Sequence, residues 1–382
     1  MTESFPIKRF AGLATPFYYY DLEVLKQTLD LVKKESGYCG YKAHYAVKAN
    51  ANPVLLKIIS SYGFGADCVS WNEIERALEN GFPGDSIVFA GVGKSDKEIE
   101  EALGAEIFCF NCESVQELEV IDSIAAKMGK NARVALRINP YIEAHTHRHI
   151  TTGIEESKFG ITMNELSDVV AKLKTLKRLK FIGIHFHIGS QITRMQVFKS
   201  LCTRVNELIG WFSDRNTDLR VINVGGGLGI DYEHPEKMPD FREYFSIFRE
   251  MIKLQPGQQL HFEPGRAIVG QCGSLISRVL YTKNGGSTKF AIIDAGMTDL
   301  IRPALYQAFH KIENLTSDKG KFRYDIVGPV CESSDTFGKY VEMPETKRGD
   351  LIAIRSAGAY GETMASRYNL RDLPGSVFTE QA

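Results

Sequence analysis

A lysine stands at the end of an apolar run near the N-terminus, in Tyr45-Ala46-Val47-Lys48-Ala49-Asn50. An amine that is desolvated at the end of a strand can be nucleophilic and can form an imine with an aldehyde. An isolated lysine at such a place is more often a salt-bridged side chain, so the lysine alone does not decide between the two interpretations. Lys48 is therefore a candidate attachment point for an aldehyde.

A glycine run, Gly225-Gly226-Gly227, ends another β-rich stretch. Glycines allow backbone N–H groups to turn inward and bind a phosphate at a strand-to-helix junction. The run is not the dinucleotide fingerprint, because Ile230 stands where its last glycine would fall, and it lacks the P-loop lysine. A phosphate-binding loop and a simple tight turn both remain open.

Charged and imidazole side chains end two further runs, in Glu263-Pro264-Gly265-Arg266 and in His185-Phe186-His187. The two histidines share one face of a strand by the period-two rule. They suggest a metal, but no third ligand appears at zinc-like spacing, and a buried, hydrogen-bonded histidine is the simpler interpretation for each. We predict no metal site.

Short β-rich runs alternate with amphipathic helical patterns up to residue 266. The predicted strands cover residues 44–48, 65–70, 86–91, 106–111, 133–139, 181–189, 220–225 and 259–263. Eight strand-helix units in about 250 residues match a (β/α)8 barrel of the TIM type, whose functional residues lie beyond the C-terminal ends of the strands. An open, doubly wound sheet is the alternative that alternation alone does not exclude.

The alternation of strand and helix patterns ends after Glu263, where β-rich stretches follow one another with few helical patterns between them. This predicts a mainly antiparallel β-domain, to which a strand from about residues 8–20 contributes. We therefore expect an N-terminal strand segment over residues 1–20, a barrel over 21–266 and a C-terminal β-domain over 267–382.

The composition is that of an ordinary globular protein. The chain has 382 residues with 46 Lys+Arg and 47 Asp+Glu, and 43% of its residues are hydrophobic. This argues against disorder and against nucleic-acid binding. No apolar run reaches the roughly 18 residues of a membrane span, and no secretory signal is found. Seven scattered cysteines indicate reduced thiols, so we expect a cytoplasmic protein without membrane or nucleic-acid partners.

Taken together and in this order, the four motifs that contain Lys48, His187, the glycine run and Glu263 resemble those of the alanine-racemase-fold (fold type III) decarboxylases that use pyridoxal phosphate. The C-terminal third is similar to the bacterial diaminopimelate decarboxylases in particular. The similarity there lies in Arg302-Pro303-Ala304-Leu305-Tyr306, Cys331-Glu332-Ser333-Ser334-Asp335, Gly358-Ala359-Tyr360 and Met364-Ala365-Ser366-Arg367-Tyr368-Asn369. Thr152-Gly153 and Lys158-Phe159-Gly160 also fit. The resemblance covers nearly the whole chain and departs from the family's Arg-Pro-rich ending at residues 370–382.

This resemblance implies that pyridoxal phosphate is joined to Lys48 as an imine. Glu263 would hold the proton on the ring nitrogen, so that the ring accepts the electrons left by departing CO2, and His187 would stack on the ring. Arg137 is expected to orient Glu263 or the ring oxygen. The other implied cofactor contacts are Ser190, Gly226, Gly227, Gly265, Arg266 and Tyr360.

The implied reaction converts meso-2,6-diaminopimelate to L-lysine and CO2, the last step of lysine biosynthesis. The second amino-acid group of this substrate needs a cation for its carboxylate and an anion for its ammonium group. The resemblance assigns these contacts to Arg266, Arg302, Tyr306, Glu332 and Tyr360. Cys331 is the expected acid that returns the proton. Its segment would come from a partner subunit, which implies a homodimer with shared active sites.

Three alternatives remain to be weighed. A decarboxylase of ornithine or arginine would need acidic groups for a cationic tail, without Arg302. A racemase pairs the ring nitrogen with a cation, so Glu263 argues against it. A non-catalytic carrier would lack the β-domain, and a regulatory paralogue would be expected to lose Lys48 or Cys331, both of which are present.

Two further patterns have simpler explanations. Cys109-Phe110-Asn111-Cys112 has metal-like spacing but no second pair, so we expect neither zinc nor redox chemistry. His145, His147 and His149 alternate in a predicted loop. We expect that loop, with Lys158-Phe159-Gly160, to help close the pocket rather than bind a metal.

Overall fold

The computed structural model describes residues 5–142 and 158–379. Contacts divide the chain into two compact units. The first, here called the β-unit, comprises Met1–Thr28, Ile230–Pro239 and Arg266–Ala382; the second, the barrel unit, comprises Leu29–Gly229 and Asp240–Gly265. Among the described residues, no helix is both long and apolar enough to cross a membrane.

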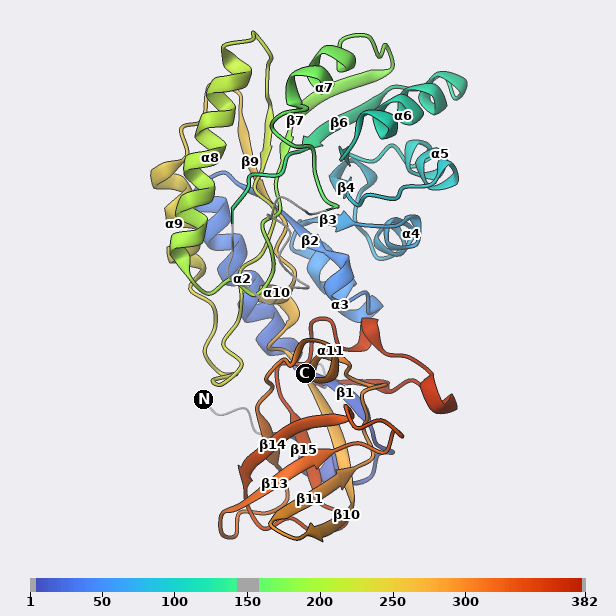
Figure 1. Cartoon of the computed structure of the whole chain (residues 1–382), viewed down its shortest axis with the longest axis vertical. Coiled ribbons are helices and arrows are strands. Elements are labelled where there is room, and N and C mark those ends of the chain that lie inside the picture. Colours follow the sequence, from blue (N-terminus) through green and yellow to red (C-terminus); the bar gives the residue numbers. More distant parts are fainter. Residues whose placement is uncertain (1–4, 143–157, 380–382) are drawn as a thin grey trace. The chain divides into compact units, whose positions relative to one another are not determined.

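Eight parallel strands close into a barrel in the barrel unit (Figure 1). Each strand pairs with the next, and β2 pairs with β9, so the sheet has no free edge. The predicted (β/α)8 barrel is therefore confirmed, and the open sheet is excluded. The strands are β2 (Lys42–Ala46), β3 (Gly65–Cys68), β4 (Ile87–Phe89), β5 (Cys109–Cys112), β6 (Ala132–Arg137), β7 (Leu179–His185), β8 (Val221–Asn223) and β9 (Gln259–Phe262).

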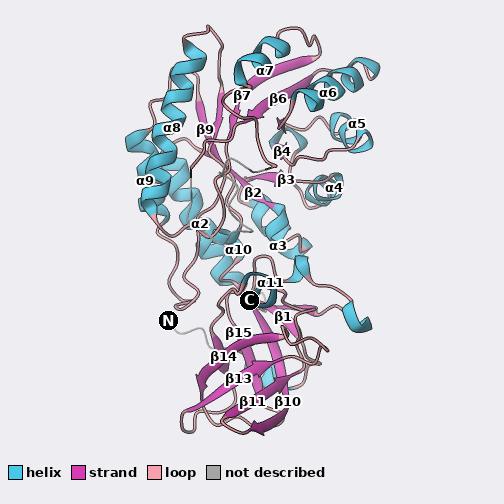
Figure 2. Cartoon of the chain, in the orientation of Figure 1, coloured by secondary structure: helices cyan, strands magenta, loops and turns pink. Residues whose placement is uncertain are grey.

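The helices of the barrel unit lie outside its strands (Figure 2). Several begin at a polar side chain that accepts a hydrogen bond from the first helical turn. Ser70 and Ser114 act in this way, and Ser95 forms a reciprocal capping box with Glu98. The helices are α3 (Pro53–Ser61), α4 (Trp71–Glu79), α5 (Asp96–Gly104), α6 (Val115–Lys127), α7 (Leu166–Leu173), α8 (Met195–Ser213) and α9 (Phe241–Met251); α2 (Leu22–Tyr38) precedes them.

The β-unit contains a mainly antiparallel sheet with strand order β12-β15-β10-β11-β13-β14, and β1 joins it by pairing with β10 and β16. Among the described strand pairs of this unit, only β11–β13 and β1–β16 are parallel. The predicted β-domain with an N-terminal strand is confirmed. Its strands are β1 (Phe17–Tyr20), β10 (Gly273–Gly285), β11 (Thr288–Ile293), β12 (Ile312–Asn314), β13 (Phe322–Val327), β14 (Thr336–Met343), β15 (Leu351–Ile354) and β16 (Gly375–Phe378), and its helices include α10 (Arg266–Val269) and α11 (Arg302–Tyr306).

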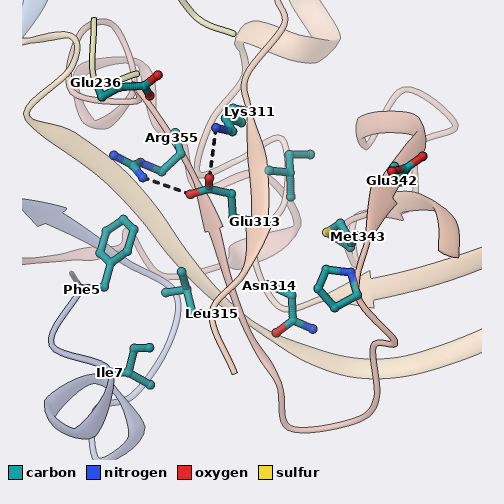
Figure 3. A pocket seen from close by; sticks show the side chains of 12 residues that line it. Phe5, Ile7, Glu236, Lys311, Glu313, Asn314, Leu315, Glu342, Met343 and Arg355 are labelled. Carbon is teal, nitrogen blue, oxygen red and sulfur yellow. Dashed lines mark hydrogen bonds and ion pairs between the residues drawn. The ribbon is translucent and has the colours of Figure 1, made fainter. Parts of the chain in front are cut away.

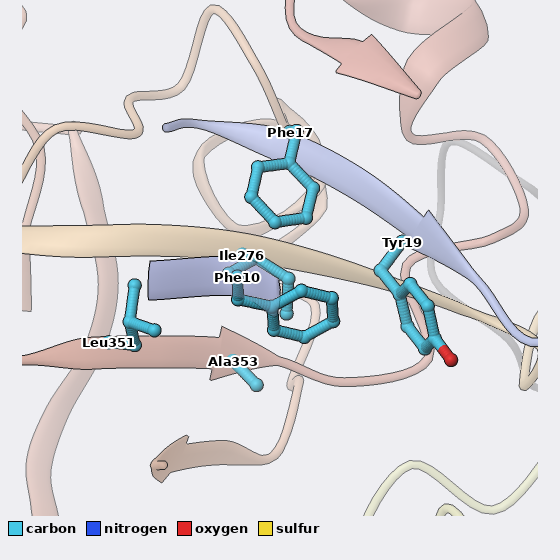
Figure 4. Packing of buried hydrophobic residues seen from close by; sticks show 6 residues of the cluster. All are labelled: Phe10, Phe17, Tyr19, Ile276, Leu351 and Ala353. Atoms are coloured by element: carbon cyan, nitrogen blue, oxygen red, sulfur yellow. The ribbon is translucent and has the colours of Figure 1, made fainter. Parts of the chain in front are cut away.

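The N-terminal strand is shorter than predicted, because the short helix α1 (Ile7–Ala11) precedes it. The helical turn directs Phe10 into the core of the β-unit, where its ring lies 4.9 Å from that of Tyr19 and 5.2 Å from that of Phe17 (Figure 4). An extended chain would place alternate residues on opposite faces and would not bring these rings together in this way. Aromatic packing of the turn therefore overrides the β-like composition of this stretch.

Candidate active site

Glu263 follows β9 inside the barrel and is only 4% exposed. Its Oε1 accepts hydrogen bonds from Asn223 at 2.7 Å and from Asn111 at 3.4 Å, and its Oε2 accepts one from Nε2 of His185 at 2.9 Å. Burial alone would raise the pKa of Glu263, but the adjacent His185 and then Lys48 hold that pKa well below its usual range. The carboxylate is therefore held ionised and fixed from several sides.

Lys48 lies in a 3-10 turn, Val47–Ala49, directly after β2. Its Nζ donates to Oδ2 of Asp67 at 2.6 Å, and Asp67 on β3 is fully buried. Burial and then the charge of Glu263 raise the pKa of Asp67, whereas the Lys48 ammonium opposes that shift. The predicted amine is thus held at the barrel end by a buried carboxylate that the sequence analysis did not single out, while 33% of its side chain stays exposed.

The glycine loop after β8 comes very close to its neighbours. A Cβ on Gly226 would lie 2.1 Å from the backbone oxygen of Glu263, and one on Gly227, whose φ is +107°, would lie 2.8 Å from that of Gly189. A Cβ on Gly265 would meet the Ala46 side chain at 3.0 Å. Only glycine fits at 226 and 227, so a side chain would fill a cradle that is now lined by backbone. Such a cradle suits the phosphate of a cofactor.

His187 lies beyond β7, in the loop that continues to Ser190, and its side chain is half-buried. Burial and then the charges of Lys48 and Arg137 hold the pKa of His187 well below its usual range. The ring is therefore neutral near pH 7, and a flat neutral ring can stack on an aromatic cofactor. An amine, an ionised carboxylate, a neutral imidazole and a glycine cradle in one unit fit pyridoxal phosphate.

Arg137 ends β6 and does not hydrogen-bond to Glu263, so the first of its two predicted roles is wrong, whereas contact with the ring oxygen stays a prediction. Its Nη1 donates to Oε1 of Glu113 at 2.9 Å, and Oε2 of Glu113 accepts a hydrogen bond from the backbone N–H of Gly160 at 2.9 Å. Glu113 therefore fixes Arg137 and the Lys158-Phe159-Gly160 turn together. Glu263 is oriented by His185 and the two asparagines instead.

A second cluster lies in the β-unit around the hydroxyl of Tyr232. Nη1 of Arg266 donates to this hydroxyl at 2.6 Å, and Nη1 of Arg302 donates to it at 2.8 Å. The same nitrogen of Arg302 lies 2.8 Å from Nε2 of His310, and the guanidinium of Arg266 lies 4.9 Å from the centre of the Tyr360 ring. Three predicted substrate residues, Arg266, Arg302 and Tyr360, are thus brought together.

Arg302 is 4% exposed, and burial lowers its pKa. Its hydrogen-bond partners within the described residues are a phenol and an imidazole, neither of which carries a negative charge. A buried cation with neutral partners is costly, so this cluster favours an anionic ligand.

The other predicted substrate and acid residues have different surroundings. Cys331 is exposed, and its backbone N–H donates to Oδ1 of Asn369 at 3.3 Å. The Glu332 carboxylate accepts a hydrogen bond from the Tyr368 hydroxyl at 2.7 Å. Tyr306 ends α11, one turn beyond Arg302. Within the described chain, neither Cys331 nor Glu332 hydrogen-bonds to the arginine cluster.

The β-unit also has a groove of about 580 Å³ beside β12. At its centre Glu313 pairs with Arg355 at 3.0 Å and with Lys311 at 3.3 Å (Figure 3). Its lining carries two cations, Lys311 and Arg355, and three carboxylates, Glu236, Glu313 and Glu342, so the groove has no excess of positive charge.

Several side chains of both clusters were missed by the sequence analysis. A signal existed for two of them, because Asp67 is an acid inside an apolar strand and Tyr232 closely follows the glycine loop. Asn111 and Asn223 lie in or beside motifs that were considered for other reasons, and no pattern marks their amides as partners of Glu263. His310 gave no signal; the missed residues are Asp67, Asn111, Asn223, Tyr232 and His310.

No metal centre is found in residues 5–142 and 158–379, where no group of three or more histidine, cysteine or acidic residues could hold an ion. Cys109 and Cys112 are buried free thiols. The predicted loop of His145, His147 and His149 and the Thr152-Gly153 motif lie outside the described residues.

Comparison with known proteins places this geometry in context. A family model described as the pyridoxal binding domain of pyridoxal-dependent decarboxylases matches residues 22–270. A diaminopimelate decarboxylase of Bacteroides thetaiotaomicron is 59% identical over 380 residues, which cover 99% of this chain and 98% of that protein. One from Helicobacter pylori strain J99 is 42% identical over 368 residues, or 95% of this chain and 89% of that protein.

The fold of this chain also matches that of a solved relative over nearly the whole length. The crystal structure of the Helicobacter pylori diaminopimelate decarboxylase complexed with L-lysine matches 98% of this chain and 94% of its own, with a TM-score of 0.92 and 40% identity. These similarities confirm the predicted carboxy-lyase class and the predicted pyridoxal phosphate cofactor. The chain belongs to the diaminopimelate decarboxylase family of pyridoxal-dependent decarboxylases.

Proposed function

We propose that this chain converts meso-2,6-diaminopimelate to L-lysine and CO2, the last step of lysine biosynthesis. The observation that carries the choice of substrate is Arg302, a buried cation whose partners within the described residues are neutral. Diaminopimelate has a distal carboxylate that could bind this cation, whereas lysine, ornithine and arginine have none. The names of the relatives and the lysine held by the Helicobacter pylori structure support the same choice.

The barrel unit would hold the cofactor. Lys48 would bind its aldehyde through Nζ, Gly226, Gly227, Gly265 and Ser190 would surround its phosphate, and Glu263 would hold the proton on its ring nitrogen. When bound, pyridoxal phosphate supplies an electron sink for the bond that breaks as CO2 leaves. The ionised Glu263 suits this role, since a hydrogen bond to a charged group contributes about 1.5–3 kcal/mol.

The neutral His187 would cover one face of the cofactor ring and exclude water from it. The side chains that fix Glu263 matter as much as Glu263 itself, because His185, Asn223 and Asn111 keep its carboxylate from turning away. The racemase alternative needs a cation at this position and does not fit a buried, ionised carboxylate.

The β-unit would supply the substrate contacts. Arg302 and Arg266 would bind the distal carboxylate, Glu332 the distal ammonium, and Tyr306 and Tyr360 would donate hydroxyl hydrogen bonds. Fork-shaped guanidinium donors match a carboxylate better than the point charge of a lysine does.

Cys331 would return the proton to the carbon from which CO2 has left. Its exposure on the β-unit supports a site completed by a second copy of the chain, so we infer a homodimer with shared active sites. All seven cysteines are free thiols, which is consistent with a cytoplasmic location.

A direct test measures CO2 release from diaminopimelate, lysine, ornithine and arginine side by side, with and without added pyridoxal phosphate. We expect release from diaminopimelate to exceed release from the others by about 10³-fold or more, because a site built for a polar group rejects an analogue that lacks it. Comparable release from ornithine or arginine would overturn the assignment.

A further inference from the structure

We propose that Tyr232 and His310 are positioning residues that fix the guanidinium of Arg302 so that one edge of it is kept for the distal carboxylate of the substrate. This inference rests on the proposed function, which gives Arg302 that carboxylate. Neither residue belongs to the motifs on which the family resemblance depends.

The guanidinium of Arg302 has five N–H donors. Its Nη1 carries two of them and lies 2.8 Å from the Tyr232 hydroxyl and 2.8 Å from Nε2 of His310. Both hydrogen atoms of Nη1 therefore already have an acceptor. Among the described residues Nη2 and Nε have no hydrogen-bond partner, and Nε is buried. Nε and Nη2 carry parallel N–H bonds, the arrangement that a carboxylate accepts in a bidentate manner.

The tautomer of His310 is dictated by its other neighbour. Nδ1 of His310 lies 2.8 Å from the backbone oxygen of Arg355, which can only accept, so Nδ1 carries the hydrogen and Nε2 the lone pair. The Arg355 backbone is held in turn, because its N–H donates to the Lys311 oxygen at 2.8 Å and its side chain pairs with Glu313 (Figure 3). His310 thus acts as a fixed acceptor.

A protonated His310 could not accept this bond and would place a cation against a cation. Its ring is 2% exposed, and burial followed by the charge of Arg302 lowers the pKa of His310 to about 3. The imidazole therefore remains neutral at any pH at which the enzyme would work.

Tyr232 connects the two arginines. Its hydroxyl accepts from Arg266 and Arg302, the guanidinium carbon of Arg302 lies 5.0 Å from its ring centre, and its ring packs edge-on against His310 at 5.0 Å. A carboxylate in its place would orient the arginines but would also cancel the charge that attracts the substrate. Neutral acceptors orient Arg302 and leave its charge available.

The test compares Tyr232→Phe, His310→Leu and His310→Gln with the wild-type holoenzyme. Steady-state CO2 release is measured with diaminopimelate and with lysine, which lacks the distal carboxylate, and cofactor affinity is followed by absorbance. We expect Tyr232→Phe and His310→Leu to lower kcat/KM for diaminopimelate by about 10- to 100-fold, mainly through KM, because small misplacements of a binding group have effects of this size. The residual rate with lysine and the affinity for the cofactor should not change.

His310→Gln is the conservative variant, since a glutamine amide offers an oxygen to Arg302 and an N–H to the Arg355 carbonyl. It should keep kcat/KM for diaminopimelate within about threefold of wild type. Because His310 acts through Arg302, His310→Leu should cause no further loss when it is added to Arg302→Ala.

Additive losses in that double variant, an equal loss of the rate with lysine, or normal turnover of diaminopimelate by His310→Leu would each overturn the positioning role. If His310→Leu shows no cooperative unfolding transition, Tyr232→Phe decides: a selective loss supports the proposal, and unchanged kinetics reject it. A wild-type protein that releases no CO2 from diaminopimelate removes the proposed function and this inference together. Normal wild-type activity with unaffected variants removes this inference alone.

Discussion

Buried charge is balanced differently in the barrel unit and in the β-unit. In the barrel unit the Lys48 ammonium lies 2.6 Å from the Asp67 carboxylate, and Glu263 accepts hydrogen bonds from three side chains. In the β-unit Arg302 is as deeply buried as Glu263 but meets only a phenol and an imidazole among the described residues.

The barrel unit and the β-unit therefore hold their buried charges in two different ways. In the barrel unit Lys48 already pairs with the opposite charge of Asp67, and Glu263 already accepts three side-chain hydrogen bonds, so the fold keeps both groups in place by itself. In the β-unit Arg302 keeps a positive charge that its described partners orient without neutralising it, and this state is stabilised when an anion binds. Changes in the first cluster should therefore affect the cofactor, and changes in the second should affect the substrate.

The largest effect is expected from Lys48→Ala in the barrel unit. Without the amine the cofactor cannot be held covalently, and Asp67 loses its partner, so turnover should fall by about 10⁴-fold or more and the visible absorbance of the bound cofactor should disappear. Absorbance spectra measure the bound cofactor, and CO2 release measures turnover. Lys97→Ala, at a side chain that is 81% exposed, is the matched control and should behave like wild type. Retained absorbance together with turnover would contradict the assignment.

Arg302→Ala should affect the arginine cluster of the β-unit and therefore the turnover of the substrate. We expect a loss of about 10⁴-fold in kcat/KM for diaminopimelate, since the substrate carboxylate then lacks its partner, with little change in cofactor affinity. Cofactor titration and steady-state kinetics on the same preparation separate the two. The exposed Arg323 on β13 provides the control variant, Arg323→Ala. A parallel loss of cofactor affinity would indicate a structural role for Arg302.

Glu263→Gln is expected to have an intermediate effect. The side chain keeps its size but loses its charge, and its amide would face the donors of Asn223 and His185. Decarboxylation should slow by about 10²-fold, the usual cost of removing one preorganised electrostatic contact, while the cofactor still binds. Single-turnover CO2 release measures this, with Glu106→Gln at an 81% exposed side chain as control. A rate equal to that of wild type would rule out the role of the carboxylate.

The smallest effect concerns stability rather than activity. His44 and His261 of the barrel unit lie 2.9 Å apart, and burial followed by the charge of His44 lowers the pKa of His261 to about 2. In the unfolded chain this imidazole titrates near pH 6.5, so the unfolded state takes up a proton below that pH and the folded state does not. The free energy of unfolding therefore falls as the pH drops below about 6.5.

His261→Gln should reduce the loss of stability between pH 7.5 and pH 5 by up to about 2 kcal/mol, which is 1.36 kcal/mol for each pH unit below the unfolded value. Denaturant unfolding at the two pH values measures this. His234→Gln serves as control, because the His234 side chain is 61% exposed. An unchanged difference between the two pH values in His261→Gln would show that His261 is protonated in the folded protein.

The sequence was informative about the barrel because short β-rich runs alternate with amphipathic helical patterns and because its chemistry lies at strand ends. Lys48, His187 and Glu263 could be identified in this way. Side-chain partners could not, since Arg302 and Tyr232 are 70 positions apart and the Glu263 and His185 pair is separated by 78. Such contacts depend on how loops turn, and local patterns do not encode that. The short helix α1 was missed for a related reason, because packing of Phe10 decided its conformation.

The pairing of β1 with β16 has a consequence for how the molecule is made. Tyr20 accepts hydrogen bonds from Thr379, which is 359 positions away, so the first strand of the β-unit finds this neighbour only after residue 379 has been synthesised. The barrel strands pair with their successors in the order in which they are synthesised, and only the closing pair, β2 with β9, depends on the last of them. Every strand of the barrel is therefore synthesised before Gly375–Phe378, the strand that pairs with Phe17–Tyr20 in the β-unit.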